Sequence, residues 1–441
     1  MSDLPRNAVT RAAKLASLPL GFAGRTALGL GKRVGGRPAE LVALEMQART
    51  AEQLFKVLGE LKGGAMKFGQ AMSIFESAFP EELAAPYRAM LTKLQDSAPA
   101  LPAPVVHEVL ARELGPRWRR SFQEFSDEPV AAASIGQVHR GVWKDGRQVA
   151  VKIQYPGAGP ALLSDLTQIS RVAKVATVWI PGIDIKPILE ELRSRMAEEL
   201  DYRLEAKSQE AFARGFDGDP HFFIPHVVKG SERVIVSEWV EGAPLSGVIA
   251  SGSQAERDAA AKLYMEFLLV GPERVGILHA DPHPGNFRIL ADGRLGIIDF
   301  GAVKRLPGGL PPEMGHFMSL ALAGDAAGTL AGLRETGFVR ESMDIDAPRL
   351  LEYLEPFVAP LRTDTFTFSR AWLREVFVTI NDPRQPNYTV GMKLNLPPDY
   401  LLIHRVWLGG IGVLCQIGGE VRGRETVAAH LPSADLPPVG G

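Results

Sequence analysis

This sequence of 441 residues has little cysteine, a net charge close to zero and few long apolar runs. Its single cysteine, Cys415, excludes an intramolecular disulfide framework and suits a reducing compartment. Because the formal net charge is only −2, the composition gives no sign of a nucleic-acid partner, and we expect none. The chain does have a hydrophobic fraction of 46%, which is ample for the core of an ordinary globular protein.

The sequence also lacks an obvious targeting or membrane-spanning segment. Basic residues such as Arg11 and Lys14 interrupt the apolar stretches near the N-terminus, which argues against a secretory signal. The most apolar late segment, residues 406–415, covers about half of the roughly 20 residues that a transmembrane helix needs. His404 and Arg405 directly precede it. We therefore expect a buried helix there, no transmembrane span, and a cytoplasmic protein.

The two ends of the chain differ in composition from the rest. Residues 1–39 contain seven Lys or Arg against one acidic residue, Asp3, and are rich in glycine. We interpret them as a basic flexible tail. The alternative is a peripheral contact with an anionic membrane, because positive charge beside apolar residues favours that surface. Residues 431–441 are rich in proline and glycine and are predicted to be a disordered tail.

Between the tails, the pattern divides the chain into three units. Leucines recur at helical intervals in residues 40–104, which predicts a helical extension that ends where Pro99, Pro102 and Pro104 break the chain. Residues 105–241 are predicted to form a lobe with strands, and residues 242–430 a mostly helical lobe. We therefore predict a two-lobed fold of the α+β class.

The first lobe has the clearest strand signals. Residues 138–143 and 149–153 have strand character, and the turn between them contains Asp-Gly, which is typical of a hairpin. A long charged helix is predicted from about residue 186 to residue 212. Strand character returns at residues 234–236.

The most informative stretch is HADPHPGN at residues 279–286, followed by IDFG at residues 298–301. Asn286 lies five positions after Asp281, and Asp299 lies thirteen after Asn286. These residue types at this spacing are typical of the phosphoryl-transfer centre of kinase-like enzymes. Asp281 can accept or orient a proton, whereas Asn286 and Asp299 supply the hard oxygen ligands that suit Mg²⁺ on nucleotide phosphates.

Two upstream features predict the rest of a nucleotide site. Lys152 lies in an apolar strand, where the lysine of a kinase-like lobe contacts the α and β phosphates and pairs with a helix glutamate. An alanine-rich loop stands where a kinase has its glycine-rich loop. Because alanine disfavours the positive φ angles that glycine permits, we expect the loop to cover a nucleotide in a different shape. Its residues are Ala131, Ala132, Ala133 and Ser134.

The charged helix and the segment after the last strand complete the predicted site. If the lysine is buried, it needs an acidic partner, because an unpaired buried charge is costly. Glu199 and Glu205 are both candidates, and the sequence alone does not choose between them. Residues 238–242 predict a hinge between the lobes, where backbone groups, including those of Glu238 and Val240, can bind adenine.

Taken together, these motifs resemble those of the UbiB/AarF-type atypical kinases, which are kinase-like proteins linked to isoprenoid quinone and lipid metabolism. The resemblance covers roughly residues 35–421. KFGQ at residues 67–70 matches the family's KxGQ motif, and ELD at residues 199–201 matches its ExD motif. The alanine-rich loop is a third mark of the family, and ordinary protein kinases lack all three.

The resemblance implies a two-lobed protein-kinase-like fold in which the helical extension packs over the active site. Lys67 and Gln70 would then lie near Glu199 and Asp201. By the same match, Lys152 is the small-lobe lysine and Glu205 resembles its partner. The catalytic-loop aspartate corresponds to Asp281, and the metal ligands correspond to Asn286 and Asp299.

The resemblance also implies a chemistry. ATP or ADP with Mg²⁺ would be the cofactors, and the substrate would be a lipid or an isoprenoid-like small molecule. ATP hydrolysis coupled to lipid extraction from membranes is an equivalent possibility. Protein phosphorylation is not expected, because the extension occupies the space that a protein substrate would need.

The sequence departs from the family pattern at its C-terminal end, where it lacks a clear membrane span. It also has Ala280 where ordinary kinases have arginine, and no Ala-Pro-Glu after Asp299. Two alternatives stay open. One is a catalytically silent nucleotide-binding scaffold that recruits biosynthetic partners. The other is a small-molecule phosphotransferase of the aminoglycoside or choline type, which the KxGQ motif speaks against.

Overall fold

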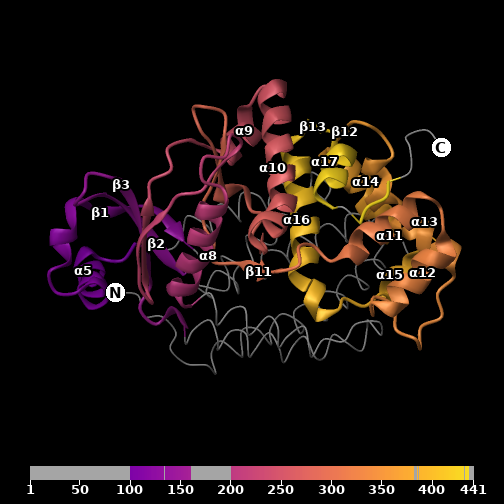
Figure 1. The fold of residues 1–441 in the computed structure, drawn as a ribbon, viewed down its shortest axis with the longest axis horizontal. Coiled ribbons are helices and arrows are strands. Elements are labelled where there is room, and N and C mark those ends of the chain that lie inside the picture. The colour runs from indigo at the N-terminus through magenta and orange to yellow at the C-terminus, as the bar shows by residue number, and fades with distance from the viewer. Residues whose placement is uncertain are drawn as a thin grey trace, which may run out of the picture.

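The computed structural model describes residues 100–133, 135–159, 200–381, 385, 387–431 and 433–436. These residues form two lobes, one built on an antiparallel sheet and the other mostly helical (Figure 1). This arrangement confirms the predicted α+β class and the two-lobed kinase-like fold. The predicted tail and nearly all of the helical extension, residues 1–99, lie outside the described residues, so their predicted packing is not addressed.

The first lobe contains a five-stranded antiparallel sheet in the order β1-β2-β3-β6-β5. The hairpin predicted around residues 144–147 is confirmed, since β2 and β3 pair from Gly136↔Gln154 to Val142↔Gln148. Gly146 in its turn has a φ of 92°, which glycine adopts without strain. The strands are β1 (Phe122–Ala133), β2 (Gly136–Trp143), β3 (Gln148–Gln154), β5 (Val227–Gly230) and β6 (Val234–Glu238).

Alternation along β3 separates the apolar core of this lobe from the predicted site. Val149, Val151 and Ile153 are fully buried on one face, where the cluster includes residues of α5 (Ala103–Leu114). Successive side chains of a strand point to opposite faces, so Lys152 lies on the other face, which α8 (Tyr202–Gly215) covers. The strand thus places one lysine opposite an apolar core.

Helix α5 crosses the predicted boundary between extension and lobe at residue 104. Pro104 stands in its first turn rather than breaking the chain there. A proline is tolerated at that place because the missing N–H would have no partner within the helix. Residues 103 and 104 therefore belong to the first lobe.

Residues 200 and 201 are not helical, although the charged helix was predicted to run through them. Asp201 is extended, with φ −110° and ψ 97°, and its side chain accepts a hydrogen bond from the N–H of Arg203 at 3.0 Å. Aspartate is among the residues preferred at the N-cap of a helix. A single helix through residue 201 was therefore a wrong prediction. A helix begins at Tyr202 and ends at Gly215, and residues 186–199 lie outside the described part.

The second lobe is built around α10 (Gln254–Val275) and α16 (Leu401–Ile417), which pack against each other (Figure 1). Helix α10 begins with a capping box formed by Ser253 and Glu256, and Gly276 ends it in the left-handed conformation. The short strands that carry the predicted catalytic loops follow: β8 (Ile277–His279), β9 (Phe287–Ile289), β10 (Leu295–Ile297) and β11 (Val303–Arg305).

Further elements complete the described chain. The strands are β4 (Phe222–Phe223), β7 (Ala243–Pro244), β12 (Phe366–Thr367) and β13 (Glu420–Val421). The helices are α9 (Leu245–Ser251), α11 (Pro312–Leu322), α12 (Ala326–Glu335), α13 (Ala347–Val358), α14 (Arg370–Asn381), α15 (Tyr388–Lys393) and α17 (Gly423–His430). Short 3₁₀ turns are η1 (Trp118–Ser121), η3 (Pro284–Asn286), η4 (Ala359–Leu361) and η5 (Pro398–Tyr400).

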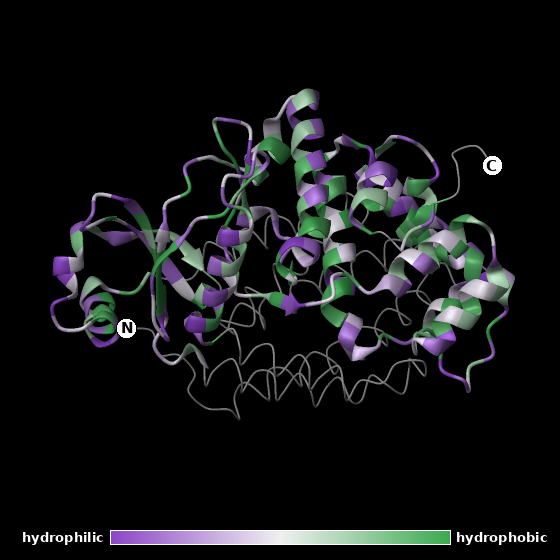
Figure 2. Ribbon diagram, viewed as in Figure 1, coloured by the Kyte–Doolittle hydropathy of each residue, from purple (hydrophilic) through white to green (hydrophobic). Residues whose placement is uncertain are grey.

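The apolar segment near the C-terminus forms α16, and Figure 2 shows that this helix is mostly hydrophobic. Among the described residues, the helical stretch Pro398–Ile417 is long and apolar enough to cross a membrane, with a hydropathy of 1.4. Its buried residues, among them Val413 and Cys415, are part of the core of the second lobe, as the prediction of a buried helix requires. Burial raises the pKa of the Cys415 thiol to about 12, so this cysteine is an inert core residue.

The first residues of the predicted C-terminal tail pack against the second lobe. Leu431 is buried, and Ala434 and Leu436 contact the same core. These residues are therefore part of the lobe rather than a free tail. Residues 437–441 lie outside the described part.

Candidate active site

Three charged side chains from three elements meet between the lobes. The Nζ of Lys152 on β3 lies 2.7 Å from Oε1 of Glu205 on α8 and 3.1 Å from Oδ2 of Asp299, which follows β10. The side chains of Lys152 and Glu205 are 14% and 5% exposed. The structure thus chooses Glu205 as the partner of Lys152, where the sequence left two candidates. Glu199 lies outside the described residues.

The charge of Lys152 is stabilised despite its burial. Burial by itself lowers the pKa of this ammonium, but the carboxylates of Asp299 and Glu205 outweigh it and hold the pKa well above its ordinary value. The ammonium also lies 5.2 Å from the ring centroid of Tyr202, a cation–π contact. The lysine is therefore permanently charged and held in place before any ligand arrives.

The catalytic-loop segment is folded around Asp281 and Asn286, both buried. The Nδ2 of Asn286 donates to the carbonyl oxygen of Asp281 at 3.2 Å, and the hydroxyl of Tyr264 on α10 donates to that of Pro282 at 2.6 Å. Because its amide nitrogen is used to hold the loop, the Oδ1 of Asn286 is the atom that can serve as a metal ligand.

Asp299 has an unusual backbone conformation, with a φ of +68°. Such a value is uncommon outside glycine, although aspartate tolerates it better than most residues. His279 Nε2 donates to the carbonyl oxygen of Asp299 at 2.7 Å, and the N–H of Gly301 donates to its Oδ1 at 3.0 Å. These bonds, together with buried Phe300, fix the direction of the carboxylate. Strain of this kind concentrates at functional sites.

The alanine-rich segment is strand rather than open loop. Residues 131–133 end β1 and pair with Val138, Gln137 and Gly136 of β2, which leaves a tight connection between the two strands. A Cβ on Gly136 would lie 2.2 Å from the carbonyl oxygen of Ile153, so this position requires glycine for close strand approach. Ser134 lies outside the described residues.

The predicted hinge connects β6 to β7. Glu238 ends β6, where its side chain accepts from the N–H of His226 at 3.1 Å and pairs with Arg147 at 3.3 Å. Val240 is buried, and with the described residues it makes no backbone hydrogen bond. The N–H and C=O of Val240 are therefore the hinge groups that can bind an adenine edge.

The donor set fits Mg²⁺ bound through a nucleotide. Among the described residues, no group of three His, Cys, Asp or Glu side chains could hold a metal ion alone. Asn286 and Asp299 offer hard oxygen atoms, and Mg²⁺ commonly takes one or two protein ligands together with substrate phosphates and water. Asn286 and Asp299 are therefore candidate ligands, and the phosphates would supply the remainder.

The sequence missed one contact of the site. An Nη of Arg405 on α16 lies 3.3 Å from Oδ1 of Asp281, although the two residues are 124 positions apart. The sequence analysis used Arg405 only as a flank of the apolar segment, and no motif marks it. Asp201 of the ExD motif caps α8 and pairs with Arg203 at 2.8 Å. Lys67 and Gln70 lie outside the described residues.

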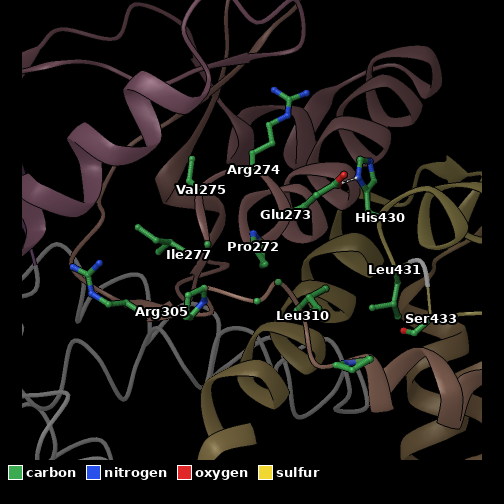
Figure 3. A pocket seen from close by; sticks show the side chains of 15 residues that line it. Pro272, Glu273, Arg274, Val275, Ile277, Arg305, Leu310, His430, Leu431 and Ser433 are labelled. Atoms are coloured by element: carbon green, nitrogen blue, oxygen red, sulfur yellow. Dashed lines mark hydrogen bonds and ion pairs between the residues drawn. The ribbon is translucent and has the colours of Figure 1, made fainter.

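A cavity of about 870 Å³ lies away from this site, at the C-terminal end of α10 and beside the loop after β11 (Figure 3). Its walls include Val275, Leu310 and Leu431, and at its edge Nδ1 of His430 lies 2.9 Å from the Glu273 carboxylate. The predicted site residues do not line it. For this reason we do not assign the cavity as the nucleotide site, despite its size.

A five-stranded lobe, a helical lobe and a lysine held by one helix glutamate and one loop aspartate define a protein-kinase-like architecture. The comparisons agree with this class. The ABC1 atypical kinase-like domain matches residues 93–330, and the chain belongs to this family of atypical kinases, the UbiB/AarF family.

Similar proteins support the family and the fold. The chain is 30% identical to the mitochondrial atypical kinase COQ8B of Danio rerio, over 76% of this chain and 54% of that protein. It is 26% identical to the mitochondrial atypical kinase COQ8 of Saccharomyces cerevisiae, over 95% and 84%. The chain spans about half the length of several curated relatives that it matches.

A solved structure extends the likeness to nearly the whole chain. It is the complex of Rv3197 with erythromycin from Mycobacterium tuberculosis, and it is 41% identical to this chain. The match has a TM-score of 0.68 and covers 91% of this chain and 100% of that one.

Proposed function

We propose that this protein is an atypical kinase or ATPase that binds Mg²⁺ and ATP and acts in isoprenoid quinone or lipid metabolism. The observation that carries the proposal is the cluster of Lys152, Glu205 and Asp299. The catalytic loop lies beside it, since the N–H of Ile298 donates to the carbonyl oxygen of Asn286 at 2.9 Å. Such a cluster costs free energy to assemble, and its components are those that phosphoryl transfer requires.

Each residue has a role in this proposal. Lys152 binds the α and β phosphates, Glu205 orients the lysine, and the hinge at Val240 binds adenine. Asn286 and Asp299 would hold Mg²⁺, which neutralises the charge on the phosphates. Asp281 accepts the proton of an acceptor hydroxyl or of water as that oxygen bonds to the γ-phosphorus. The bond from this phosphorus to the β–γ bridging oxygen breaks, and ADP leaves with its electron pair.

The proposed acceptor is a lipid, an isoprenoid-like small molecule or water, and not a protein. This part of the proposal is supported by family membership and by the family's covering extension, to which residues 40–99 correspond by motif. Residues 1–39 include seven basic residues and one acidic residue, a composition that favours an anionic membrane. A peripheral contact there would bring the site to such a substrate. The proposed location is cytoplasmic or peripheral to a membrane.

The test is Mg²⁺-dependent ATP turnover by the purified protein, with and without anionic liposomes. The Asp299→Asn variant is measured beside it as the control. Turnover that depends on Asp299 and rises with liposomes is the expected result. Equal turnover by the two proteins would refute the assignment of the site. Nucleotide binding without turnover would favour the alternative, a catalytically silent scaffold that recruits biosynthetic partners.

Macrolide binding is a second candidate, carried by the likeness to the Rv3197–erythromycin complex at 41% identity over 91% of this chain. Calorimetric titration of the full chain with erythromycin tests it. A one-to-one binding isotherm is expected, and heats no larger than those of dilution would remove this candidate.

A further inference from the structure

Arg405 is a charged residue in a helix that is otherwise mostly apolar. It is the one residue of α16 with a fixed charge, in a helix that otherwise contributes apolar side chains to the core of the second lobe. Its side chain is 36% exposed, and an Nη reaches the carboxylate of Asp281, whose side chain is 10% exposed. Helix α16 therefore carries one cation to the acceptor side of the proposed site.

A comparison with Arg257 indicates that this arginine is not placed for structure alone. Arg257 on α10 donates to three carbonyl oxygens, those of Gly252, Ile417 and Ile249, at 3.0, 2.7 and 3.0 Å. Arg405 donates one hydrogen bond to the described residues, at 3.3 Å, although a guanidinium has five N–H donors. Within the described part of the chain, its other N–H groups have no protein acceptor and can bind a ligand.

The local charges leave room for an anion beside Arg405. Lys152 is committed to Glu205 and Asp299, so it does not neutralise Asp281. Arg405 lies 3.3 Å from the Asp281 carboxylate and supplies a cation there. An anionic group on the acceptor side would meet the Asp281 carboxylate and would need a cation at the same place.

We infer that Arg405 is a phosphate-binding residue on the acceptor side of the site, with one N–H on Asp281 and others on phosphate oxygens. The planar fork of a guanidinium suits such bridging. The phosphate has two possible sources, the phosphoryl group in transfer and a phosphate carried by the acceptor. The inference rests on the proposed function for the role of Asp281, but phosphate binding at Arg405 can be measured without turnover.

The main experiment is calorimetric titration of the full chain with inorganic phosphate, with and without saturating Mg²⁺–ADP. We expect Arg405→Gln to weaken phosphate binding roughly tenfold or more, as loss of hydrogen bonds to a charged group should. Arg405→Lys should recover part of the affinity. Arg422→Gln is the matched control, because the Arg422 side chain is 74% exposed and pairs with Glu425, also on the surface. Equal phosphate affinity in the wild type and Arg405→Gln, or no binding by the wild type, overturns the inference.

Steady-state ATP turnover then separates the two sources. If Arg405 binds the phosphoryl group in transfer, Arg405→Gln lowers kcat for hydrolysis and leaves the KM for ATP unchanged. If it binds a phosphate on the acceptor, glycerol 3-phosphate binds the wild type more tightly than the variant, whereas glycerol binds both proteins alike. Should Asp299→Asn hydrolyse ATP as fast as the wild type, the proposed function fails, and the phosphate titration still decides the role of Arg405.

Discussion

The two ion pairs of the candidate site differ in burial and geometry. Lys152 bonds Glu205 at 2.7 Å with both side chains nearly buried, and a second carboxylate, that of Asp299, lies 3.1 Å away. Arg405 approaches Asp281 at 3.3 Å, and its side chain is 36% exposed. The lysine cluster is therefore fixed by the folded chain, whereas the arginine pair is longer and joins a partly exposed guanidinium to a buried carboxylate.

This difference corresponds to two halves of one reaction centre. The fixed, nearly buried pair of Lys152 and Glu205 suits a nucleotide, because its phosphates present the same geometry at every turnover and preorganised charge acts most strongly in a low-dielectric site. A pair with a partly exposed guanidinium suits an acceptor that must enter and leave. The comparison predicts that substitutions in the lysine cluster lower ATP turnover strongly. Substitution of the arginine should change the free energy of unfolding only slightly.

The largest effect is expected for Asp299→Asn. This change removes the carboxylate that both faces Lys152 and would hold Mg²⁺, so ATP turnover should fall on the order of 10³-fold, the range seen when a charge-stabilising group is lost. A coupled assay for ADP release measures it, and circular dichroism confirms that the variant is folded. Loss of less than tenfold would place the metal ligands elsewhere.

A smaller loss is expected for Glu205→Gln. Lys152 keeps Asp299 as a partner but loses its closest carboxylate, so turnover should fall roughly 10- to 100-fold and stability by about 1–3 kcal/mol. Turnover and urea unfolding measure the two effects. Glu108→Gln is the control, because its carboxylate is 69% exposed and pairs with Arg112 on the surface of α5. If Glu205→Gln and Glu108→Gln changed turnover and stability equally, the lysine cluster would have no special role.

These two predictions concern residues that the sequence could find, and the reason is local. The strand signal around the Asp-Gly turn predicted the hairpin, and period-two alternation then separates Lys152 from the apolar core. The motif spacing likewise predicted a cluster that includes Asp299. The sequence did not decide which glutamate pairs with Lys152, because that depends on where the helix begins. Asp201 caps α8, and this start places Glu205 opposite the lysine.

Contacts between distant segments were beyond the reach of sequence patterns. Arg405 and Asp281 are 124 positions apart, and the helix that joins them in space was predicted only as an apolar segment. The packing of Leu431 against the second lobe was missed for a similar reason, because a proline- and glycine-rich composition predicts a tail whether or not one leucine finds a core. Both contacts depend on tertiary packing rather than on local propensity.

A third ion pair, at the start of β4, should give an intermediate effect on stability. Asp219 is buried and accepts from Arg274 and from the N–H groups of His221 and Phe222. Burial alone would raise the pKa of Asp219, but these hydrogen bonds outweigh it and hold the pKa below its ordinary value of 3.8. Its contribution to stability is therefore present above that value and is lost as the pH falls through the lower folded-state pKa.

Asp219→Asn tests this linkage. We expect a loss of about 1–2 kcal/mol in the free energy of unfolding at pH 7, because charge-assisted hydrogen bonds become neutral ones. The difference between wild type and variant should shrink as the pH falls below about 3.8 and through the lower folded-state pKa. Urea unfolding at a series of pH values measures it, and a difference independent of pH would show that the carboxylate charge does not matter there.

The smallest effect on stability is expected for Arg405→Gln. An ion pair with a partly exposed guanidinium and one long hydrogen bond contributes about 0–1 kcal/mol, so the free energy of unfolding should change by about that much. Arg257→Gln is the internal comparison, because three part-buried hydrogen bonds to carbonyl oxygens are lost and the cost should reach about 2–3 kcal/mol. Urea unfolding of both variants measures the contrast. Equal costs would mean that Arg405 is held for the fold, whereas a small cost beside weakened phosphate binding would assign its charge to the ligand.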